Sequence, residues 1–336
     1  MPAIRIDGRP IVVEDGCTVL DAARAAGIPI PTLCHRDGCA PSAYCMVCAV
    51  RIEGRAGWQP ACSTPVAEGQ SIETDSSKIR AARQSAIELI LSDHVGDCVA
   101  PCQWACPAGL FVPGLLRRLA GTDTATIVPD AVPCRDCPAP CERACRRARF
   151  GGAVSIRRLA LALVPAFAPM PDQRAPRDFS VHMGALSDAE AERFRQGASP
   201  EPRIEPADPA AGFSADEAQR EAGRCLHCDC RKADHCRLRD RAREQGAHPG
   251  AWRGPRRAFE QDASHPSILY ESGKCIACGV CVQIAATAGE PVGLTFVGRG
   301  FGMRMAPALG KPLSEALTLC ASACAEACPT GALVMK

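Results

Sequence analysis

The cysteines constrain this chain more than any other feature of its sequence. There are 23 in 336 residues, in four groups that span residues 17–62, 98–145, 225–236 and 275–328. An odd number excludes complete internal disulfide pairing. The chain also has only 9 Phe, 3 Trp and 2 Tyr, against 29 Gly and 29 Pro, which favours small loop-rich modules over one large hydrophobic core. Bound metal is therefore the leading hypothesis for what organises these modules.

The remaining composition places the chain in a broad class. The first residues, MPAIRIDGRP, lack a basic-then-apolar signal region, and the longest apolar stretch, 159–169, is short and interrupted by Pro165. We expect a cytoplasmic protein without membrane insertion. In the reducing cytoplasm, clustered cysteines are more often metal ligands than disulfides. The formal net charge of +2 gives no reason to expect a nucleic-acid partner.

The first cysteine group follows a segment with β and α periodicity. Ile4 and Ile6 alternate with polar residues, a Gly-Arg turn and a second strand follow, and residues 18–26 predict a helix. The spacing C-x10-C-x2-C-x13-C then offers the four thiolates that a [2Fe-2S] cluster needs. These candidate ligands are Cys34, Cys45, Cys48 and Cys62. Cys39 is a rival first ligand, because C-x5-C-x2-C is close to the plant-type spacing. With its motifs PTLCH, CMVCAV and ACSTPV, the segment 3–75 resembles the [2Fe-2S] domain of the large iron-sulfur subunit of complex I and its hydrogenase and formate dehydrogenase relatives.

The second group lies after a predicted connecting helix, KIRAARQSAIELILSDH. His94-x3-Cys98 begins like the His-and-three-Cys cluster of the complex I family, but the spacing then departs from that pattern. The segments APCQWACPAGLFVPGLLRRL, CPAPCERAC and AVSIRRL instead resemble the double-cluster module of the glutamate synthase small subunit and dihydropyrimidine dehydrogenase. This resemblance implies two [4Fe-4S] clusters, one held by His94, Cys98, Cys102 and Cys145 and the other by Cys106, Cys134, Cys137 and Cys141. By position, however, this chain supplies only three cysteines of each set. Cys134 is expected to be the fourth ligand of the second set, and His94 either is the fourth ligand of the first set or merely packs at the end of the connecting helix.

The third group, EAGRCLHCDCRKADHC, allows more than one interpretation. Its cysteines are Cys225, Cys228, Cys230 and Cys236. They could hold a separate [4Fe-4S] cluster. EAGRCLHC also resembles an RCLxC motif that the double-cluster family carries upstream, so some of these cysteines could return in space to complete a cluster begun near residue 98. A tetrahedral zinc site is the third possibility.

The fourth group predicts a further [4Fe-4S] cluster. GKCIACGVCVQIA supplies Cys275, Cys278 and Cys281, and Cys328 before Pro329 supplies the fourth ligand. This pattern also resembles the complex I family, and Cys320 and Cys324 are surplus to it. The intervening GLTFVGRGFGMR predicts a hairpin or bulge and is no nucleotide-binding G-x-G-x-x-G motif. We therefore expect no flavin or NAD on this chain.

Together these patterns predict a multi-module α+β protein. The expected modules are a β-grasp [2Fe-2S] ferredoxin domain (1–78), an α-helical double-cluster module (79–160), a Pro-rich linker (161–215), a Cys-rich [4Fe-4S] segment (216–245) and a C-terminal ferredoxin-like [4Fe-4S] domain (265–336).

The same patterns and resemblances predict an electron-relay subunit. It would carry one [2Fe-2S] and three to four [4Fe-4S] clusters within a hetero-oligomer. The family resemblance implies a flavin- and NAD(P)H-binding subunit at one end and a molybdenum or tungsten formate dehydrogenase, or a nickel-iron hydrogenase, at the other. Two alternatives remain: a reduced glutamate-synthase-type oxidoreductase that needs a separate flavin subunit, and a non-catalytic metal-binding scaffold or redox sensor.

Overall fold

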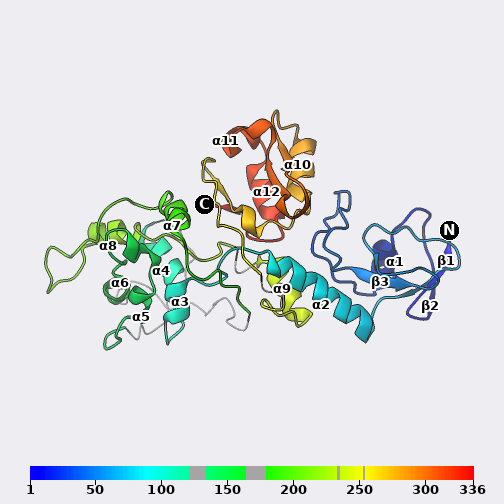
Figure 1. The fold of residues 1–336 in the computed structure, drawn as a ribbon, viewed down its shortest axis with the longest axis horizontal. Coiled ribbons are helices and arrows are strands. Elements are labelled where there is room, and N and C mark those ends of the chain that lie inside the picture. The colour runs from blue at the N-terminus through cyan, green and yellow to red at the C-terminus, as the bar shows by residue number, and fades with distance from the viewer. Residues whose placement is uncertain (122–133, 164–178, 233–234, 253) are drawn as a thin grey trace. The chain divides into compact units, whose positions relative to one another are not determined.

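The computed structural model describes residues 1–121, 134–163, 179–232, 235–252 and 254–336 (Figure 1). The chain is of mixed α+β class and divides into two compact units. The first unit comprises Met1–His94, His235–Arg257 and Asp262–Lys336, and the second comprises Val95–Asp234 and Ala258–Gln261. Each unit is therefore assembled from segments that are far apart in the sequence.

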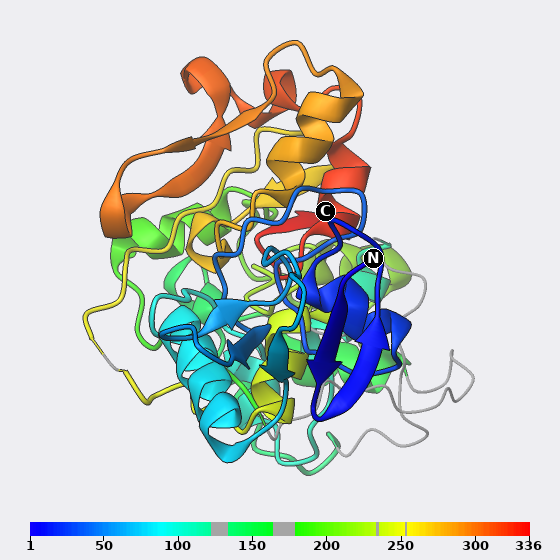
Figure 2. The same ribbon diagram turned by 90° about the vertical axis from the view of Figure 1, so that its right-hand side faces the viewer.

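The N-terminal part of the first unit is a five-stranded sheet of order β2-β1-β5-β3-β4. Its strands are β1 (Ala3–Ile6), β2 (Arg9–Val12), β3 (Ala49–Ile52), β4 (Gln59–Pro60) and β5 (Ser71–Glu73). The predicted hairpin is confirmed: β1 and β2 pair antiparallel, side by side in blue in Figure 2, and β1 also pairs with β5 in parallel. Inward-facing Ile4, Ile6, Val50 and Ile52 form the core of this sheet.

Two helices support the sheet. Helix α1 (Val19–Ala25) begins at Thr18, whose side chain forms a capping box with Asp21, as the predicted helix over 18–26 requires. Helix α2 (Ser77–Ser92) is the predicted connecting helix, and it packs on β3 and on α9 (Arg237–Glu244). The division at residue 79 inferred from the sequence therefore cuts through a helix that belongs to the first unit.

The C-terminal part of the first unit surrounds the last cysteine group. It contains helices α10 (Val280–Ala288), α11 (Leu313–Ala316) and α12 (Ala321–Ala327), strand β6 (Ile268–Tyr270) paired with β9 (Leu333–Met335), and strand β7 (Leu294–Val297) paired with β8 (Arg304–Pro307). The predicted hairpin in the glycine-rich segment is thus confirmed as β7–β8. Buried apolar residues from these elements, among them Leu313, Leu317 and Leu333, form one core.

The second unit is helical in the part that the structure describes. Its helices are α3 (Pro101–Ala105), α4 (Val112–Leu119), α5 (Pro140–Arg143), α6 (Ile156–Leu163), α7 (Asp188–Arg195) and α8 (Ala215–Ala222). Leu115, Leu116 and Leu159 pack with several cysteines in its main core.

A second, smaller core in this unit involves the predicted linker. Residues 164–178 of that linker lie outside the described residues. The rest contains α7 and buries Phe179 and Phe194, the latter stacked on Phe259 with ring centroids 4.2 Å apart. Residues 179–214 are therefore packed into the second unit.

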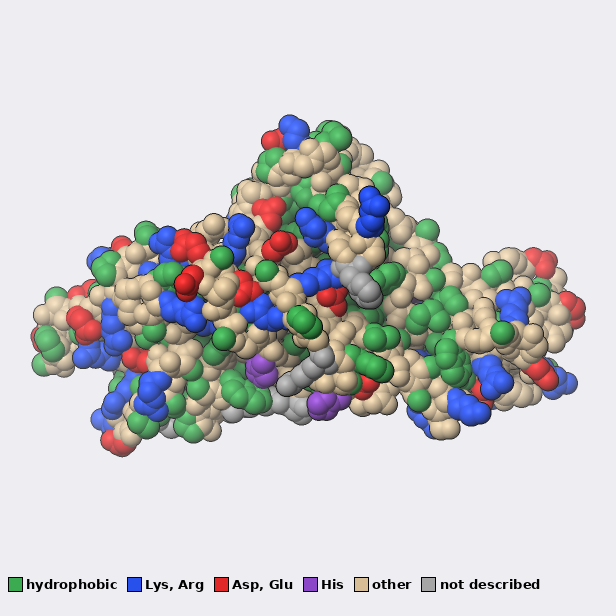
Figure 3. All heavy atoms as spheres, viewed as in Figure 1, with side chains coloured by type: hydrophobic (Ala, Val, Ile, Leu, Met, Phe, Trp, Pro, Cys, Tyr) green, Lys and Arg blue, Asp and Glu red, His purple; other side chains and the backbone are tan. Residues whose placement is uncertain are grey.

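The described surface has mixed charge. On the face drawn in Figure 3, Lys and Arg side chains are interspersed with Asp and Glu side chains. Among the described residues, no helix has the length and apolar character that crossing a membrane requires.

Candidate iron-sulfur sites

The four cysteines predicted for the [2Fe-2S] cluster lie together as two pairs. Cys34 interacts through a side-chain hydrogen bond with Cys45, and Cys48 does so with Cys62. All four are buried. They are brought together because Cys48 directly precedes β3 and Cys62 follows β4, which pairs with β3.

The electrostatics of these pairs favour one thiolate in each. The hydrogen bond from Cys45 lowers the pKa of Cys34 to about 5, and the hydrogen bond from Cys62 lowers the pKa of Cys48 to about 7. As the donors, Cys45 and Cys62 have their pKa raised by the same hydrogen bonds. Metal binding would release the remaining protons, since thiolates are the ligand form. Four converging thiols, two already acidic, fit the donor set of a [2Fe-2S] cluster.

The rival ligand Cys39 has no comparable interaction with the other three. The charged groups that act on Cys62 include Cys34, Cys45 and Cys48, and the groups that act on Cys48 include Cys34. Cys39 is absent from these interactions and is only half-buried. Cys17 packs at the edge of the sheet core.

A buried cation adjoins the N-terminal thiols. Arg83 of α2 is 3% exposed, and its guanidinium donates to the carbonyl oxygens of Ala49 and Thr74. Burial lowers the pKa of Arg83, and the negative charges of Asp75 and Cys48 oppose that shift. The guanidinium is therefore close enough to interact electrostatically with the Cys48 sulfur.

The four cysteines predicted for the C-terminal cluster line one cavity. The residues that line it include Cys275, Cys278, Cys281 and Cys328. Burial, opposed by a backbone hydrogen bond from Val280, raises the pKa of Cys278 to about 12. Charges on Cys328 and Cys275 contribute to this increase. Mutually repelling thiolates around a cavity fit a site whose charge is balanced by iron.

The turn between the first two ligands of this set has a distinctive backbone. Ala277 has a positive φ of 52°, and its N–H donates to the Cys275 sulfur over 3.4 Å. The backbone N–H of Met305 also donates to that sulfur. Tyr270 interacts with the same sulfur, and its hydroxyl donates its proton to the Met305 carbonyl oxygen over 2.6 Å. The Cys275 sulfur is therefore surrounded by hydrogen-bond donors, which stabilise a thiolate.

The surplus cysteines of the C-terminal group form a separate pair. The sulfurs of Cys320 and Cys324 are 3.8 Å apart, and the Cys320 thiol donates to Glu290 over 3.3 Å. Burial raises the pKa of both thiols. They are therefore neutral groups that pack beside the cavity and do not line it.

In the second unit, one predicted set of four is brought together. Burial, together with charges on Cys106 and Cys137, raises the pKa of Cys134 to about 11. Cys141 likewise has a pKa of about 12 because of burial, the Glu142 charge and the charges on Cys106 and Cys134. Each of the four cysteines predicted as a set therefore interacts with at least one other.

A second thiol group in this unit combines cysteines from two of the predicted ligand sets. Burial raises the pKa of Cys102, and the next contributions, in order, come from Cys145, Cys225 and Cys228. Cys228 in turn interacts with Cys225 and Cys145. Cys102 follows the start of α3, whereas Cys225 and Cys228 follow α8, so helix packing joins two cysteine groups about 120 residues apart in sequence.

The Cys225–Cys228 turn repeats the geometry of the Cys275–Cys278 turn. His227 has a φ of 49°, and its N–H donates to the Cys225 sulfur over 3.4 Å. The corresponding values at Ala277 are 52° and 3.4 Å. The RCLxC motif is the sequence signal for this arrangement. It is the basis of the alternative in which these cysteines complete a cluster begun near residue 98.

Four predicted ligands remain, namely His94, Cys98, Cys230 and Cys236. Cys98 accepts a hydrogen bond from the Val181 N–H over 3.4 Å. Burial and the Lys274 charge lower the pKa of His94 to about 3, so its imidazole is neutral at pH 7, the state that binds metals. His94 and Cys236 belong to the first unit, and Cys98 and Cys230 to the second.

A site for one metal ion needs several ligand side chains around a single point. Within the residues that the structure describes, no group of three or more His, Cys, Asp or Glu side chains is placed to hold one metal ion. A [4Fe-4S] cluster makes a different demand, because each of its four thiolates binds a different iron atom.

Comparison with known proteins identifies the N-terminal domain. Residues 3–77 match the family described as a 2Fe-2S iron-sulfur cluster binding domain. This part of the chain is therefore a ferredoxin-like [2Fe-2S] domain.

Known relatives each match a stretch of about 100 residues of this chain. The NADP-reducing hydrogenase subunit HndD of Solidesulfovibrio fructosivorans is 43% identical over 104 residues, which cover 30% of this chain and 18% of the relative. The NADPH-Fe(3+) oxidoreductase subunit alpha of Geobacter sulfurreducens is 45% identical over 98 residues, 29% of this chain and 12% of the relative. The mitochondrial 78 kDa subunit of NADH-ubiquinone oxidoreductase of Candida albicans is 35% identical over 95 residues, 28% of this chain and 13% of the relative. The match thus spans less than a fifth of each relative.

A solved structure resembles the whole chain in fold. It is an NAD+-reducing [NiFe]-hydrogenase in the H2-reduced state, with a TM-score of 0.54 and 18% sequence identity over 100% of this chain and 87% of the other. At this identity the likeness concerns the fold.

Proposed function

We propose that this chain is an iron-sulfur electron-relay subunit of a hetero-oligomeric oxidoreductase. The observation that carries the proposal is that thiols gather into four separate sets, one of them within a [2Fe-2S] domain. Bound iron-sulfur clusters supply one-electron transfer, with potentials that depend on ligands, hydrogen bonds to sulfur and solvent exposure.

The ligand assignment follows the observed sets. Cys34, Cys45, Cys48 and Cys62 would hold the [2Fe-2S] cluster. Three [4Fe-4S] clusters would be held by Cys275, Cys278, Cys281 and Cys328; by Cys106, Cys134, Cys137 and Cys141; and by Cys102, Cys145, Cys225 and Cys228. The candidate ligands that these sets do not use are His94, Cys98, Cys230 and Cys236, and the iron content decides whether the chain carries three or four [4Fe-4S] clusters.

The residues of the chain hold, insulate and stabilise these sites. Burial of the thiols excludes water, and the N–H groups of Ala277 and His227 donate to ligand sulfurs. The relatives are named as subunits of an NADP-reducing hydrogenase and of an NADH-ubiquinone oxidoreductase. These names support an NAD(P)H-linked subunit and a catalytic subunit of hydrogenase class as partners. A flavin on the first partner, and formate dehydrogenase as the other class for the second, are proposed from the family resemblance of the sequence.

Iron and acid-labile sulfide in the anaerobically purified full chain test the cofactor content. We expect about 14 iron atoms per chain with matching sulfide, or about 18 with a fourth [4Fe-4S] cluster. Zinc without sulfide would overturn the relay and support a metal-binding scaffold.

Serine variants test the reassigned set. Cys225→Ser should lower the iron content by about four atoms and remove one [4Fe-4S] signal from the electron paramagnetic resonance (EPR) spectrum. Cys320→Ser is the matched control, because Cys320 is equally buried and lies outside every set. Equal iron in the two variants would contradict the assignment.

Electron transfer itself is tested with and without a partner. NADH should reduce the chain only when a flavin-bearing subunit that copurifies with it is present. Tightly bound flavin on the isolated chain, or its direct reduction by NADH, would favour the alternative of a reduced glutamate-synthase-type oxidoreductase.

A further inference from the structure

Two buried arginines lie beside the Cys102, Cys145, Cys225 and Cys228 set. Arg147 is 1% exposed and lies in a 3₁₀ turn directly after Cys145, and Arg224 is 0% exposed and directly precedes Cys225. Arginine is almost never fully buried unless its charge is paired. The groups that balance these two charges therefore need to be identified.

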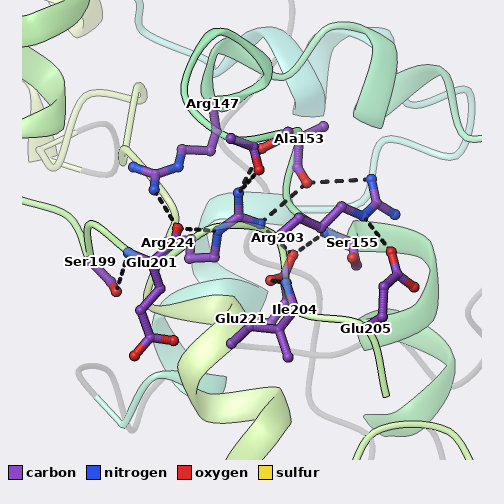
Figure 4. A network of polar contacts seen from close by, with 12 residues as sticks. Arg147, Ala153, Ser155, Ser199, Glu201, Arg203, Ile204, Glu205, Glu221 and Arg224 are labelled. Atoms are coloured by element: carbon purple, nitrogen blue, oxygen red, sulfur yellow. Dashed lines mark hydrogen bonds and ion pairs between the residues drawn. The ribbon is translucent and has the colours of Figure 1, made fainter. Parts of the chain in front are cut away.

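One buried carboxylate balances Arg224. Oε1 of Glu221, also 0% exposed, is 2.8 Å from Nη1 of Arg224 and accepts the N–H of Ser155 at the same distance (Figure 4). Arg224 also donates to the carbonyl oxygens of Gly151 and Gly152 over 2.9 and 2.7 Å. This guanidinium is fully paired.

Arg147 has no such carboxylate. Its Nη2 donates to the backbone oxygen of Glu201 over 2.8 Å, while its buried Nε and Nη1 atoms have no hydrogen-bond partner. The Glu201 carboxylate instead binds the half-exposed Arg220 over 3.0 Å. Two other arginines near the same set, Arg117 and Arg146, are each paired with a buried carboxylate. Of the charges buried in the network of Arg147 and Arg224, two are positive and only that of Glu221 is negative, so one positive charge is left over.

The ligand sulfur of Cys145 lies beside this excess charge. Burial raises the pKa of Cys145, and hydrogen bonds from the backbone N–H groups of Val154 and Arg147, together with the Arg224 charge, oppose that shift. The Cys145 sulfur also interacts electrostatically with Arg147. These surroundings therefore favour a buried negative charge that the neighbouring side chains do not supply.

We infer that Arg147 and Arg224 raise the reduction potential of the cluster held by Cys102, Cys145, Cys225 and Cys228. The inference rests on the proposed function. Reduction brings one electron from the donor to this site and makes or breaks no bond, so the site becomes one unit more negative. A buried positive charge stabilises the reduced form more than the oxidised form, because little water is present to screen it.

The test is a redox titration of the full chain followed by EPR spectroscopy. The Cys102→Ser variant identifies the signal of this cluster as the one that disappears. Arg147→Met should then lower the midpoint potential of that signal, whereas Arg147→Lys, which keeps the charge, should leave it near the wild-type value. Arg220→Met is the matched control, because it removes a charge from a solvent-screened arginine near the same network.

A variant of opposite sign keeps the inference testable if Arg147→Met loses its cluster. Glu221→Gln removes the buried negative charge and should raise the potential of the same signal. The inference is overturned if Arg147→Met shifts the potential no more than Arg220→Met, or if Glu221→Gln lowers it. Failure of the proposed function gives a different result, since the Cys102→Ser variant would then lose neither iron nor any signal.

Discussion

Replacement of Arg83 by Met removes buried hydrogen bonds between α2 and the N-terminal domain. The guanidinium donates to the Ala49 carbonyl oxygen from Nε over 3.1 Å and from Nη2 over 2.8 Å, and to the Thr74 carbonyl oxygen from Nη2 over 2.9 Å. Methionine fills the space of the aliphatic stem but offers no donor. Both carbonyl oxygens would lose this hydrogen-bond donor at a buried position that little water can reach.

The size of the effect follows from those contacts. Leaving a buried acceptor unsatisfied costs about 1 to 3 kcal/mol, so two acceptors predict a loss of about 2 to 6 kcal/mol in the free energy of unfolding. Arg80 lies three residues earlier on α2 and pairs with Asp75 over 2.6 Å, with both side chains about 60% exposed. Loss of an exposed pair of this kind costs no more than about 1 kcal/mol.

The assay follows the visible circular dichroism of the [2Fe-2S] domain during urea denaturation of the full chain. With a slope of roughly 1 to 3 kcal/mol per molar urea, Arg83→Met should lower the midpoint by about 1 M or more. Arg80→Met should shift it by a few tenths of that. Equal midpoints for the two variants would refute the reasoning. Arg83→Lys should fall between them, since lysine keeps the charge but not the forked geometry.

Three other predictions concern the C-terminal domain and the metal. Gly298→Ala should destabilise the β7–β8 hairpin more than Gly300→Ala, because a Cβ at 298 would lie 2.4 Å from the Gly302 oxygen, whereas a Cβ at 300 meets open space; the urea midpoints of the two variants compare them. Burial alone would raise the pKa of Glu290, but hydrogen bonds from the backbone N–H groups of residues 318–320 outweigh it and lower the pKa to about 2. Because this folded-state pKa lies below the unfolded value near 4.5, the carboxylate stabilises the fold fully above about pH 4.5 and loses that effect as the pH falls toward 2. The stability difference between wild type and Glu290→Gln should therefore shrink between pH 6 and pH 3, and a constant difference would contradict the assignment. Removal of iron with a chelator should leave the cysteine-rich regions largely disordered, since the clusters replace a hydrophobic core there; an unchanged near-UV spectrum of the apo-protein would show otherwise.

The sequence predicted what depends on local geometry. The alternation at Ile4 and Ile6 and the capping residue Thr18 predicted the hairpin and helix that the structure shows, because strand period and helix capping are set by neighbouring residues. The four-cysteine spacing of residues 34–62 predicted the domain that the family comparison identifies. The set of Cys106, Cys134, Cys137 and Cys141 stays a prediction that came from a family resemblance, and in the structure its members interact with one another.

Only the tertiary structure decided which distant residues share a site. Nothing in the local spacing of Cys225 and Cys228 shows that α8 delivers them to Cys102 and Cys145, and the RCLxC motif permitted this without requiring it. The buried arginines are a clearer case. Arg83, Arg147 and Arg224 look in the sequence like any other surface arginines, and their burial depends on how helices pack around them. Short-range patterns record the turns and caps that a few neighbouring residues determine, whereas the electrostatic surroundings of a site are the sum of side chains that only the folded chain brings together.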